Sequence, residues 1–497
     1  MPKQTEELPL VGMELDSNSE TPLSKQLYSL LQEAILSGRL AGGIKLPGTR
    51  ALSKGLNVSR NTVVSAFEQL MIEGYIYGKI GAGTFVTKDL PDKVFELKEP
   101  APENKRSAVQ NKNFESNFNK KELQELSFSR AEIYPFQNGI PSLEEFPLST
   151  WLKITNKVGS YLPYLQLGYE NSAGYKSLRS AVAEYLKTYR AVKCTPEQII
   201  IINGSQQGLD LIGRVLLKKN KNVLLEDPCY WGTRSSLIST NVNIYPTPVD
   251  DEGIDIGYAV KNYPDADFIY TTPSHQFPLG SIMSVSRRLE LLEYSKKKNA
   301  WIIEDDYDSE FRYSGSPLPS LQGMDEWKRV IYIGTFSKVL FPGLRLGYMV
   351  LPSIEMVKHF AVAKSMIDRQ SPIFEQLITT KFIEDGHFTR HIRKMRMLYK
   401  SRQEFLINEL RKEIGDTIKV NPSEAGMQLI VRLPKKMNDK KVASIASKNK
   451  LIVYPLSNYV LKFKREPALI LGYTAFNEKE LKAGVKKMQK SIESYIN

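Results

Sequence analysis

Lys338 has the surroundings that a chemically active amine requires. It lies in a turn between two short apolar runs, directly after the hydroxyls of Thr335 and Ser337, and Arg345 follows it. Such a lysine is either a solvated charge or an amine beside an anion site, where it can condense with an aldehyde. Because the chain holds 68 Lys and Arg, it is these neighbours, and not the lysine alone, that favour the second interpretation.

Short apolar runs elsewhere predict the elements that position this turn. The runs lie at 199–202, 223–225, 268–270, 301–303, 330–333 and 348–351. Helical stretches separate several of them, which is typical of a mostly parallel sheet with helices on both faces. The sequence therefore predicts an α/β fold here. Ligands of such sheets bind beyond the carboxyl ends of the strands, so the turns at those ends are the candidate site.

The turns after these runs carry further polar candidates. Ser205 and Gln206 begin a helix, where backbone N–H groups and a hydroxyl suit either a phosphate or an ordinary helix cap. Tyr230 either stacks on an aromatic ring or packs in the core. The acidic segment 304–310 has no nearby His or Cys at metal-ligand spacing, so no metal is expected. A carboxylate there can instead keep a pyridine nitrogen protonated.

The first ninety residues predict a different kind of domain. The expected elements are a helix beginning after Thr21, helices at 50–54 and 59–73, and strands at 75–77 and 84–87. Three helices followed by a two-stranded ribbon make a winged helix-turn-helix. Between Thr21 and Lys88, eight basic residues stand against three acidic ones. The short polar side chains at the start of the third helix either reach DNA or form a solvated helix start.

The composition and the pattern of apolar residues along the sequence divide the chain into domains and limit the partners that it can bind. The segment 89–131 is rich in Lys, Glu, Asn, Pro and Ser and lacks periodicity, which predicts a flexible linker between domains at 15–88 and 132–497. A net charge of +13 permits a nucleic-acid partner. No apolar run approaches the length of a membrane span, and two cysteines suit a reducing compartment. We therefore expect a cytoplasmic protein without a membrane partner.

The turn around Lys338 resembles the Schiff-base lysine motif of fold-type I pyridoxal-phosphate (PLP) enzymes, the aspartate aminotransferase family. The resemblance implies that Lys338 binds the PLP aldehyde as an internal aldimine and that Thr335, Ser337 and Arg345 hold the phosphate. The other contacts that it implies are Asp305 to the pyridinium nitrogen, Tyr307 to the ring 3-hydroxyl, Tyr230 to the ring face, and Ser205 with Gln206 to the phosphate.

Two further positions follow from the same resemblance. Tyr169 matches a residue that reaches the phosphate of the partner subunit, which implies a homodimer. Aminotransferases usually place an asparagine against the ring hydroxyl, and Phe277 stands at that position here. The resemblance therefore implies that His275 or Gln276 takes over this contact.

The N-terminal segment resembles the DNA-binding domain of the GntR family. The likeness covers Leu46-Pro, the helix start after Val58, and the glycine-rich turn that ends at Val86. It implies a double-stranded DNA partner. The residues that it places on the DNA are Arg50 and Arg60, Ser59 and Thr62 on the recognition helix, and Lys79 or Gly81 at the wing.

Together the two parts resemble the MocR/GabR group of bacterial transcriptional regulators, over 21–88 and roughly 136–497. The resemblance implies a PLP-dependent regulator that senses an amine, an amino acid or PLP through Lys338, with the aminotransferase-like domain serving as a sensor and not as an enzyme. Two alternatives remain. The chain is a working aminotransferase with an accessory DNA-binding domain, or it binds DNA while its large domain has lost the cofactor.

Two positions depart from the pattern of relatives that hold an amino-acid carboxylate. Ile470 stands where aminotransferases carry the carboxylate-binding arginine, and Gly232 stands where GabR-like regulators are expected to carry another. Losing such a charge-assisted contact costs about 1.5–3 kcal/mol, so 4-aminobutyrate is not favoured as the effector. An amine without a carboxylate, an amino acid held by Arg234 or Arg465, and PLP itself remain open.

Overall fold

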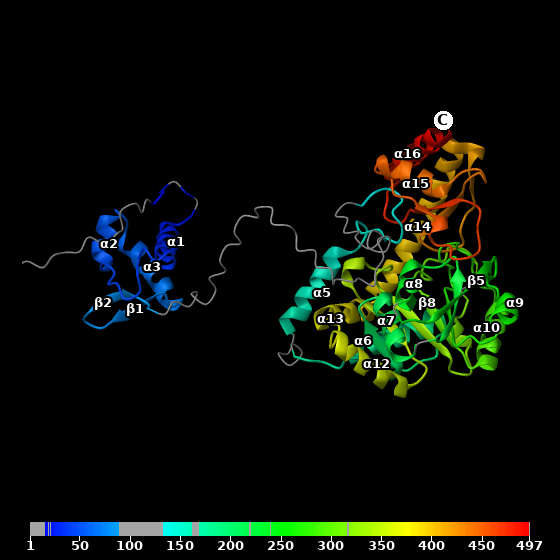
Figure 1. Ribbon diagram of the computed structural model, residues 1–497, viewed down its shortest axis with the longest axis horizontal. Coiled ribbons are helices and arrows are strands. Elements are labelled where there is room, and N and C mark those ends of the chain that lie inside the picture. The colour runs from blue at the N-terminus through cyan, green and yellow to red at the C-terminus, as the bar shows by residue number, and fades with distance from the viewer. Residues whose placement is uncertain are drawn as a thin grey trace, which may run out of the picture. The chain divides into compact units, whose positions relative to one another are not determined.

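The computed structural model describes residues 15–17, 19, 21–88, 133–161, 168–217, 220–238, 240–315 and 318–496. The chain divides into two compact units, Met1–Phe128 and Ser129–Asn497, each of which is described by itself (Figure 1). The expected linker at 89–131 lies outside the described residues.

The described part of the first unit is a three-helix domain with a two-stranded wing. Its elements are α1 (Leu23–Leu36), α2 (Thr49–Gly55), α3 (Arg60–Ile72), β1 (Ile76–Lys79) and β2 (Gly83–Val86). Helical spacing directs Leu27 and Leu31 of α1 into one core with Val63 and Phe67 of α3, and none of the four is more than 3% exposed. The strands β1 and β2 pair antiparallel. The expected winged helix-turn-helix is confirmed.

An eight-stranded sheet forms the centre of the second unit. Its strands in spatial order are β3 (Ile199–Ile202), β10 (Gly347–Val350), β9 (Val330–Thr335), β8 (Trp301–Asp306), β7 (Phe268–Thr271), β4 (Asn222–Asp227), β5 (Asn243–Asp250) and β6 (Gly253–Ile254). The strands from β9 to β5 are parallel, whereas β10 and β6 pair antiparallel with their neighbours. The expected mostly parallel sheet is confirmed, and each expected apolar run overlaps a strand.

Burial of both sheet faces explains the uninterrupted apolar runs. Ile199 and Ile201 of β3 belong to one hydrophobic cluster, while Ile200 and Ile202 belong to another, because successive side chains of a strand point to opposite faces. Helices complete both clusters. The helices of this part are α5 (Leu148–Tyr161), α6 (Lys176–Arg190), α7 (Ser205–Val215), α8 (Trp231–Ile238), α9 (Ile256–Asn262), α10 (Val285–Lys298), α11 (Leu321–Met324), α12 (Ile354–Ile367) and α13 (Ile373–Glu384).

The C-terminal part holds a second, smaller sheet that the apolar runs do not indicate. It is antiparallel, in the order β11 (Lys419–Val420), β12 (Gln428–Arg432), β14 (Ala468–Gly472) and β13 (Tyr454–Pro455). The helices of this part, drawn in orange to red in Figure 1, are α14 (His387–Ile414), α15 (Asp439–Lys448) and α16 (Glu478–Ile496). None of the helices in the described ranges is both long enough and apolar enough to cross a membrane.

The beginning of the second unit is anchored in this C-terminal core. Phe136 is fully buried there, and its carbonyl oxygen accepts a hydrogen bond from the Gly472 backbone N–H at 2.9 Å. A Cβ atom at Gly484 would lie 2.9 Å from the Phe136 ring, so the ring packs closely only because α16 has a glycine at that point. This anchoring brings the next residues, Asn138 and Gly139, to the carboxyl ends of the large sheet's strands.

Candidate functional site

A cavity of about 360 Å³ lies where the strands of the large sheet end. Nine of the residues expected to bind a cofactor line it: Ser205, Gln206, Tyr230, Asp305, Tyr307, Thr335, Ser337, Lys338 and Arg345. The wall is completed by residues that the sequence did not single out, among them Asn138, Gly139, Tyr270, Met427, Gln428, Tyr454 and Tyr459. The geometry thus brings side chains from distant turns and from both sheets into one space.

The Lys338 amine is enclosed and oriented by a backbone carbonyl. Its Nζ donates a hydrogen bond to the Gly139 oxygen at 2.8 Å. Burial lowers the pKa of this amine, against the opposing effect of the Asp308 and Asp305 carboxylates. A lowered pKa increases the fraction of neutral amine, which is the nucleophilic form. Gly139 has a positive φ of 74°, and a Cβ atom there would lie 2.6 Å from Nζ.

Asp305 presents a buried carboxyl oxygen that lacks a partner. Its Oδ2 accepts a hydrogen bond from the Tyr270 hydroxyl at 2.7 Å, while its Oδ1 has no partner among the described residues. Burial raises the pKa of Asp305 to about 7, although the Tyr270 hydrogen bond acts in the opposite direction. Asp305 lies opposite Ile333 in the β8–β9 register, so the carboxyl and the turn that carries Lys338 come from adjacent parallel strands.

An anion site lies at the start of α7. Gly204, with a positive φ of 95°, precedes Ser205, the first residue of this helix, so backbone N–H groups face the cavity end. Arg345 approaches the same point, with its Nη2 donating to the Asn203 oxygen at 2.9 Å. The Ser337 hydroxyl is buried without a partner in the described part of the chain, and the Thr335 hydroxyl accepts from the Ser337 N–H at 3.1 Å. This grouping suits a phosphate.

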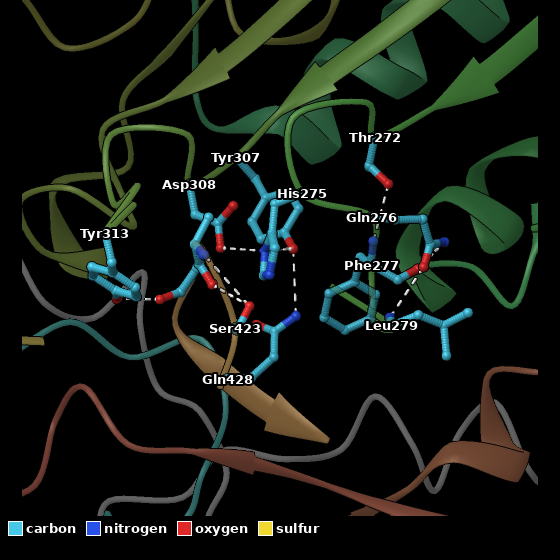
Figure 2. Close-up of polar contacts among 12 residues, drawn as sticks. Thr272, His275, Gln276, Phe277, Leu279, Tyr307, Asp308, Tyr313, Ser423 and Gln428 are labelled. Carbon is cyan, nitrogen blue, oxygen red and sulfur yellow. Dashed lines mark hydrogen bonds and ion pairs between the residues drawn. The ribbon is translucent and has the colours of Figure 1, made fainter. Parts of the chain in front are cut away.

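His275 reaches the cavity only through Tyr307. Its Nδ1 lies 2.9 Å from the Tyr307 hydroxyl and 3.0 Å from Asp308 Oδ2, and the side chain is 1% exposed (Figure 2). The Gln428 amide donates to the same Tyr307 hydroxyl at 3.4 Å. The Gln276 side chain is also buried, and its amide donates to the Pro228 and Phe277 carbonyls. Neither side chain occupies the cavity wall as the resemblance implies, because both are used to hold neighbouring residues.

Three other expected residues lie away from this cavity within one chain. Arg465 donates to the backbone oxygens of Asp227 and Val249 and lines a different cavity. Arg234 lies on α8 and does not line the cavity around Lys338. Tyr169 is 85% exposed, and the Arg369 guanidinium lies 5.2 Å from its ring centre. The geometry of one chain therefore provides no arginine for an effector carboxylate at the positions that we expected.

Of the residues expected on DNA, all are exposed except Thr62, which is half-buried. Ser59 caps α3, accepting a hydrogen bond from the Thr62 N–H at 3.1 Å, and its hydroxyl lies 2.9 Å from that of Thr62. Arg60 is exposed, and its Nε donates to Thr49 Oγ1 at 3.4 Å. The remaining expected contacts, all exposed, are Arg50 near the start of α2, and Lys79 and Gly81 at the wing.

No metal centre is found within the ranges that the structure describes. No group of three or more His, Cys, Asp or Glu side chains there is arranged to hold a metal ion. The acidic side chains of 304–310 are instead engaged in separate contacts. Glu304 accepts from two backbone N–H groups at 2.9 Å, and Asp306 pairs with Arg190 at 2.8 Å.

The raised pKa of Asp305 predicts a pH-dependent stability. Because the folded-state pKa of about 7 exceeds the ordinary value of 3.8, the carboxyl's contribution to stability is full below the ordinary pKa and is lost as the pH rises through 7. Asp305→Asn keeps an acceptor for Tyr270 and removes the ionisation. In cofactor-free protein we expect it to gain about 1–3 kcal/mol over wild type between pH 5 and pH 8.

Denaturant unfolding of both proteins at the two pH values measures this gain. The matched control is Asp210→Asn, because Asp210 is 40% exposed and pairs with Arg214 on the surface of α7. A stability difference between Asp305→Asn and wild type that does not change with pH would contradict the burial argument.

Two family models match the chain. The model described as Aminotransferase class I and II matches residues 165–486, and the model described as Bacterial regulatory proteins, gntR family, matches residues 23–86. The first covers most of the second unit, including the cavity turns from 203 to 345. The second covers all the described helices and strands of the first unit.

Similar proteins combine the same two parts over nearly their whole length. The probable rhizopine catabolism regulatory protein MocR of Rhizobium meliloti is 34% identical over 96% of this chain and 95% of its own length. The pyridoxine biosynthesis transcriptional regulator PdxR of Corynebacterium glutamicum is 27% identical over 94% of this chain and 95% of its own. Among solved structures, Pyrococcus horikoshii kynurenine aminotransferase matches with a TM-score of 0.69 and 28% identity, covering 76% of this chain and 94% of the aminotransferase. The chain therefore belongs to the MocR-type transcriptional regulators, in which a GntR-family DNA-binding domain is joined to an aminotransferase class I and II domain.

Proposed function

We propose that this transcriptional regulator binds PLP in the cavity around Lys338 and changes its DNA binding in response to an amine, an amino acid or PLP itself. The observation that carries the proposal is the cavity wall, where the Lys338 amine lies near a buried Asp305 oxygen and a buried Ser337 hydroxyl without partners in the described chain. A buried polar group without a partner costs about 1–3 kcal/mol. A ligand with complementary groups removes that cost.

The residues present fit PLP. Bound PLP supplies an aldehyde that condenses reversibly with a primary amine. The groups that would hold it are Lys338 at the aldehyde, Asp305 Oδ1 at the ring nitrogen, Tyr307 at the ring hydroxyl, Tyr230 at the ring face, and Ser205, Gln206, Thr335, Ser337 and Arg345 at the phosphate. The anion site at the start of α7 supports the last assignment.

The protein prepares these groups for their roles. Burial keeps a fraction of the Lys338 amine neutral, and the Gly139 carbonyl directs it. A protonated ring nitrogen facing Asp305 would favour the carboxylate form of that residue and lower its pKa again. Tyr307 is held by His275 and Gln428, which fixes the position of its hydroxyl.

The path from the cavity to the rest of the chain begins at the Gly139 carbonyl. This residue belongs to the segment 136–139, which begins five residues after the end of the expected linker at 131. One end of the segment is fixed in the C-terminal core by Phe136, and the other contacts the Lys338 amine. A ligand that replaces the Lys338 amine as the hydrogen-bond donor to Gly139 alters the contacts of the segment 136–139. In the sequence this segment continues toward the DNA-binding unit.

DNA binding belongs to the first unit, through α3 and the wing. We propose that Arg50, Ser59, Arg60, Thr62, Lys79 and Gly81 contact an operator. We also propose a homodimer in which Tyr169 reaches the partner's cofactor, because this exposed side chain lies away from the cavity of its own chain. Two DNA-binding units per dimer then require a two-part operator. Such a regulator acts in the cytoplasm, where bacterial DNA lies.

The similarity to kynurenine aminotransferase favours one alternative, a working aminotransferase with an accessory DNA-binding domain. Against it, Ile470 leaves an amino-acid carboxylate without the arginine that aminotransferases carry at this position. Turnover of amino and oxo acids above about 1 s⁻¹, which is ordinary for enzymes, would favour the alternative over the sensor.

Lys338→Ala separates cofactor binding from DNA binding. We expect the variant to lose the visible absorbance of bound PLP and the effector response, because no other lysine lines the described cavity. Affinity for a promoter fragment, measured without effector, should remain within about threefold of wild type. Retention of the absorbance by the variant would refute the role of Lys338.

Gly139→Ala tests the orientation of the amine. The new methyl group would lie 2.6 Å from the movable Lys338 Nζ, so we expect a displaced amine, an intact fold and PLP affinity at least tenfold weaker. The matched control is Gly386→Ala, which has a similar φ of 73° but nothing within 4 Å. If the two variants bind PLP with equal affinity, any loss of affinity comes from backbone strain alone and not from the contact of the new methyl group with Lys338 Nζ.

Arg60→Ala tests the recognition helix. Loss of a contact to base or phosphate should weaken operator binding by about 1–3 kcal/mol while the cofactor spectrum stays unchanged. Arg39→Ala is the matched control in the same unit, because its guanidinium already pairs with Glu33 at 3.1 Å. Gel-shift titration with both variants gives the comparison, and wild-type affinity of Arg60→Ala would refute the assignment.

A further inference from the structure

The charge of the cavity wall limits what can bind beside the cofactor. Among the described residues that line it, the only cationic side chains are Lys338 and Arg345. Arg345 contacts the Asn203 carbonyl at the start of α7, where the proposed function places the phosphate. Once a phosphate occupies Arg345, the described wall offers no second arginine to an effector carboxylate.

The two positions at which related proteins carry a carboxylate-binding arginine are occupied here by Gly232 and Ile470, in closely packed surroundings. A Cβ atom at Gly232 would lie 2.4 Å from the Tyr230 ring and 2.5 Å from Gln206 Oε1, so a side chain there displaces two residues of the cavity wall. Ile470 is fully buried in β14, between Ile430 of β12 and Tyr454 of β13. The packing around Gly232 thus leaves no room for a guanidinium, and position 470 carries a buried apolar side chain in its place.

The groups next to the reactive amine are hydrogen-bond acceptors. The Gly139 carbonyl oxygen accepts from Lys338 Nζ at 2.8 Å. Asn138 lines the same wall, and its buried Oδ1 has no partner in the described part of the chain. A buried acceptor without a donor disfavours a carboxylate oxygen beside it and favours an N–H or O–H group, and the Asn138 amide nitrogen can in turn donate to a hydroxyl oxygen.

The rest of the wall is aromatic or neutral. Phe277 lies edge-on to Tyr230, with ring centres 5.7 Å apart, and Tyr454, Tyr459 and Met427 reach the cavity from the C-terminal part. Such a surface packs against the carbon skeleton of a ligand. It adds no charge that would compensate for an anionic group.

We propose that the effector of this cavity is a primary amine that carries hydroxyl groups and no carboxylate, of the amino-alcohol class. The inference rests on the proposed function, because it takes the bound cofactor for granted. It assigns Asn138 as the residue that selects for the hydroxyl-bearing ligand, and it removes amino acids from the three effector classes that the sequence left open.

Matched ligands test the proposal on the full-length protein loaded with PLP. Serinol and ethanolamine differ from serine by lacking its carboxylate, and propylamine lacks both the carboxylate and the hydroxyl. Titration of each, followed by the cofactor absorbance, gives half-saturating concentrations. We expect the values for serinol and ethanolamine to be at least tenfold below that for serine. Serine acting at equal or lower concentration, or no shift with any amine, would overturn the proposal.

Asn138→Ala separates recognition from general packing. It should raise the half-saturating concentration of serinol at least fivefold and change that of propylamine by less than twofold. Asn262→Ala, an exposed asparagine at the end of α9, is the control and should change neither. An equal effect of Asn138→Ala on both ligands would overturn the role of Asn138. A wild-type protein that shows no absorbance with added PLP would refute the proposed function itself, whereas a normal absorbance with a preference for serine refutes only this inference.

Discussion

The second unit depends on one constraint, which is that an amine and a carboxyl are removed from water at the ends of two adjacent parallel strands. Lys338 follows β9 and Asp305 lies near the end of β8. Burial lowers the pKa of Lys338 and raises the pKa of Asp305, and both shifts favour the neutral form of the group. Burying such groups is unfavourable unless partners compensate. The sheet tolerates these two buried groups because apolar clusters cover both of its faces. Burial of the clusters stabilises the fold and offsets the unfavourable burial of polar groups at the cavity.

Buried carboxyls of the same region differ in how well they are paired. Glu226 accepts from the Thr272 N–H at 3.1 Å and hydroxyl at 2.8 Å, and Glu304 accepts from the N–H groups of Leu321 and Gln322. Asp305, in contrast, keeps one oxygen without a partner in the described chain. Asp306 and Asp308 also keep one oxygen without a partner among the described residues, but of these three Asp305 is the one that lines the cavity, which could not be seen in the sequence.

Much of the fold and of the cavity was predictable from the sequence, for a definite physical reason. Strands buried on both faces are apolar throughout, and parallel strands place their following turns at one edge, so turns as distant as Ser205 and Arg345 could be expected together. The smaller sheet was not predictable in this way, because β11 and β13 are two residues long and one of them contains Pro455. Consequently Gln428, Tyr454 and Tyr459 were missed as cavity residues.

Other differences arise from contacts between segments far apart in the chain. Asn138 and Gly139 gave no local signal, because they reach the cavity only when Phe136 is fixed beside Gly484. His275 was expected at the cofactor, but Asp308 draws its ring behind Tyr307. Arg465 was expected at an effector, but its guanidinium is used by backbone carbonyls elsewhere.

The contact between Lys338 and Gly139 also bears on the difference between the proposed sensor and an enzyme that uses the same cofactor. An enzyme gains rate only from interactions that strengthen in the transition state, whereas a regulator needs a ligand that favours one of two states. The hydrogen bond from Lys338 to Gly139 has the property that a sensor requires, since it exists only while the amine is free to donate. It also joins the reactive group to the first residues of the unit, the part that continues in sequence toward the DNA-binding domain. A coupling of 1–3 kcal/mol, typical of allosteric proteins, lies within the range of one hydrogen bond made or lost in a buried site.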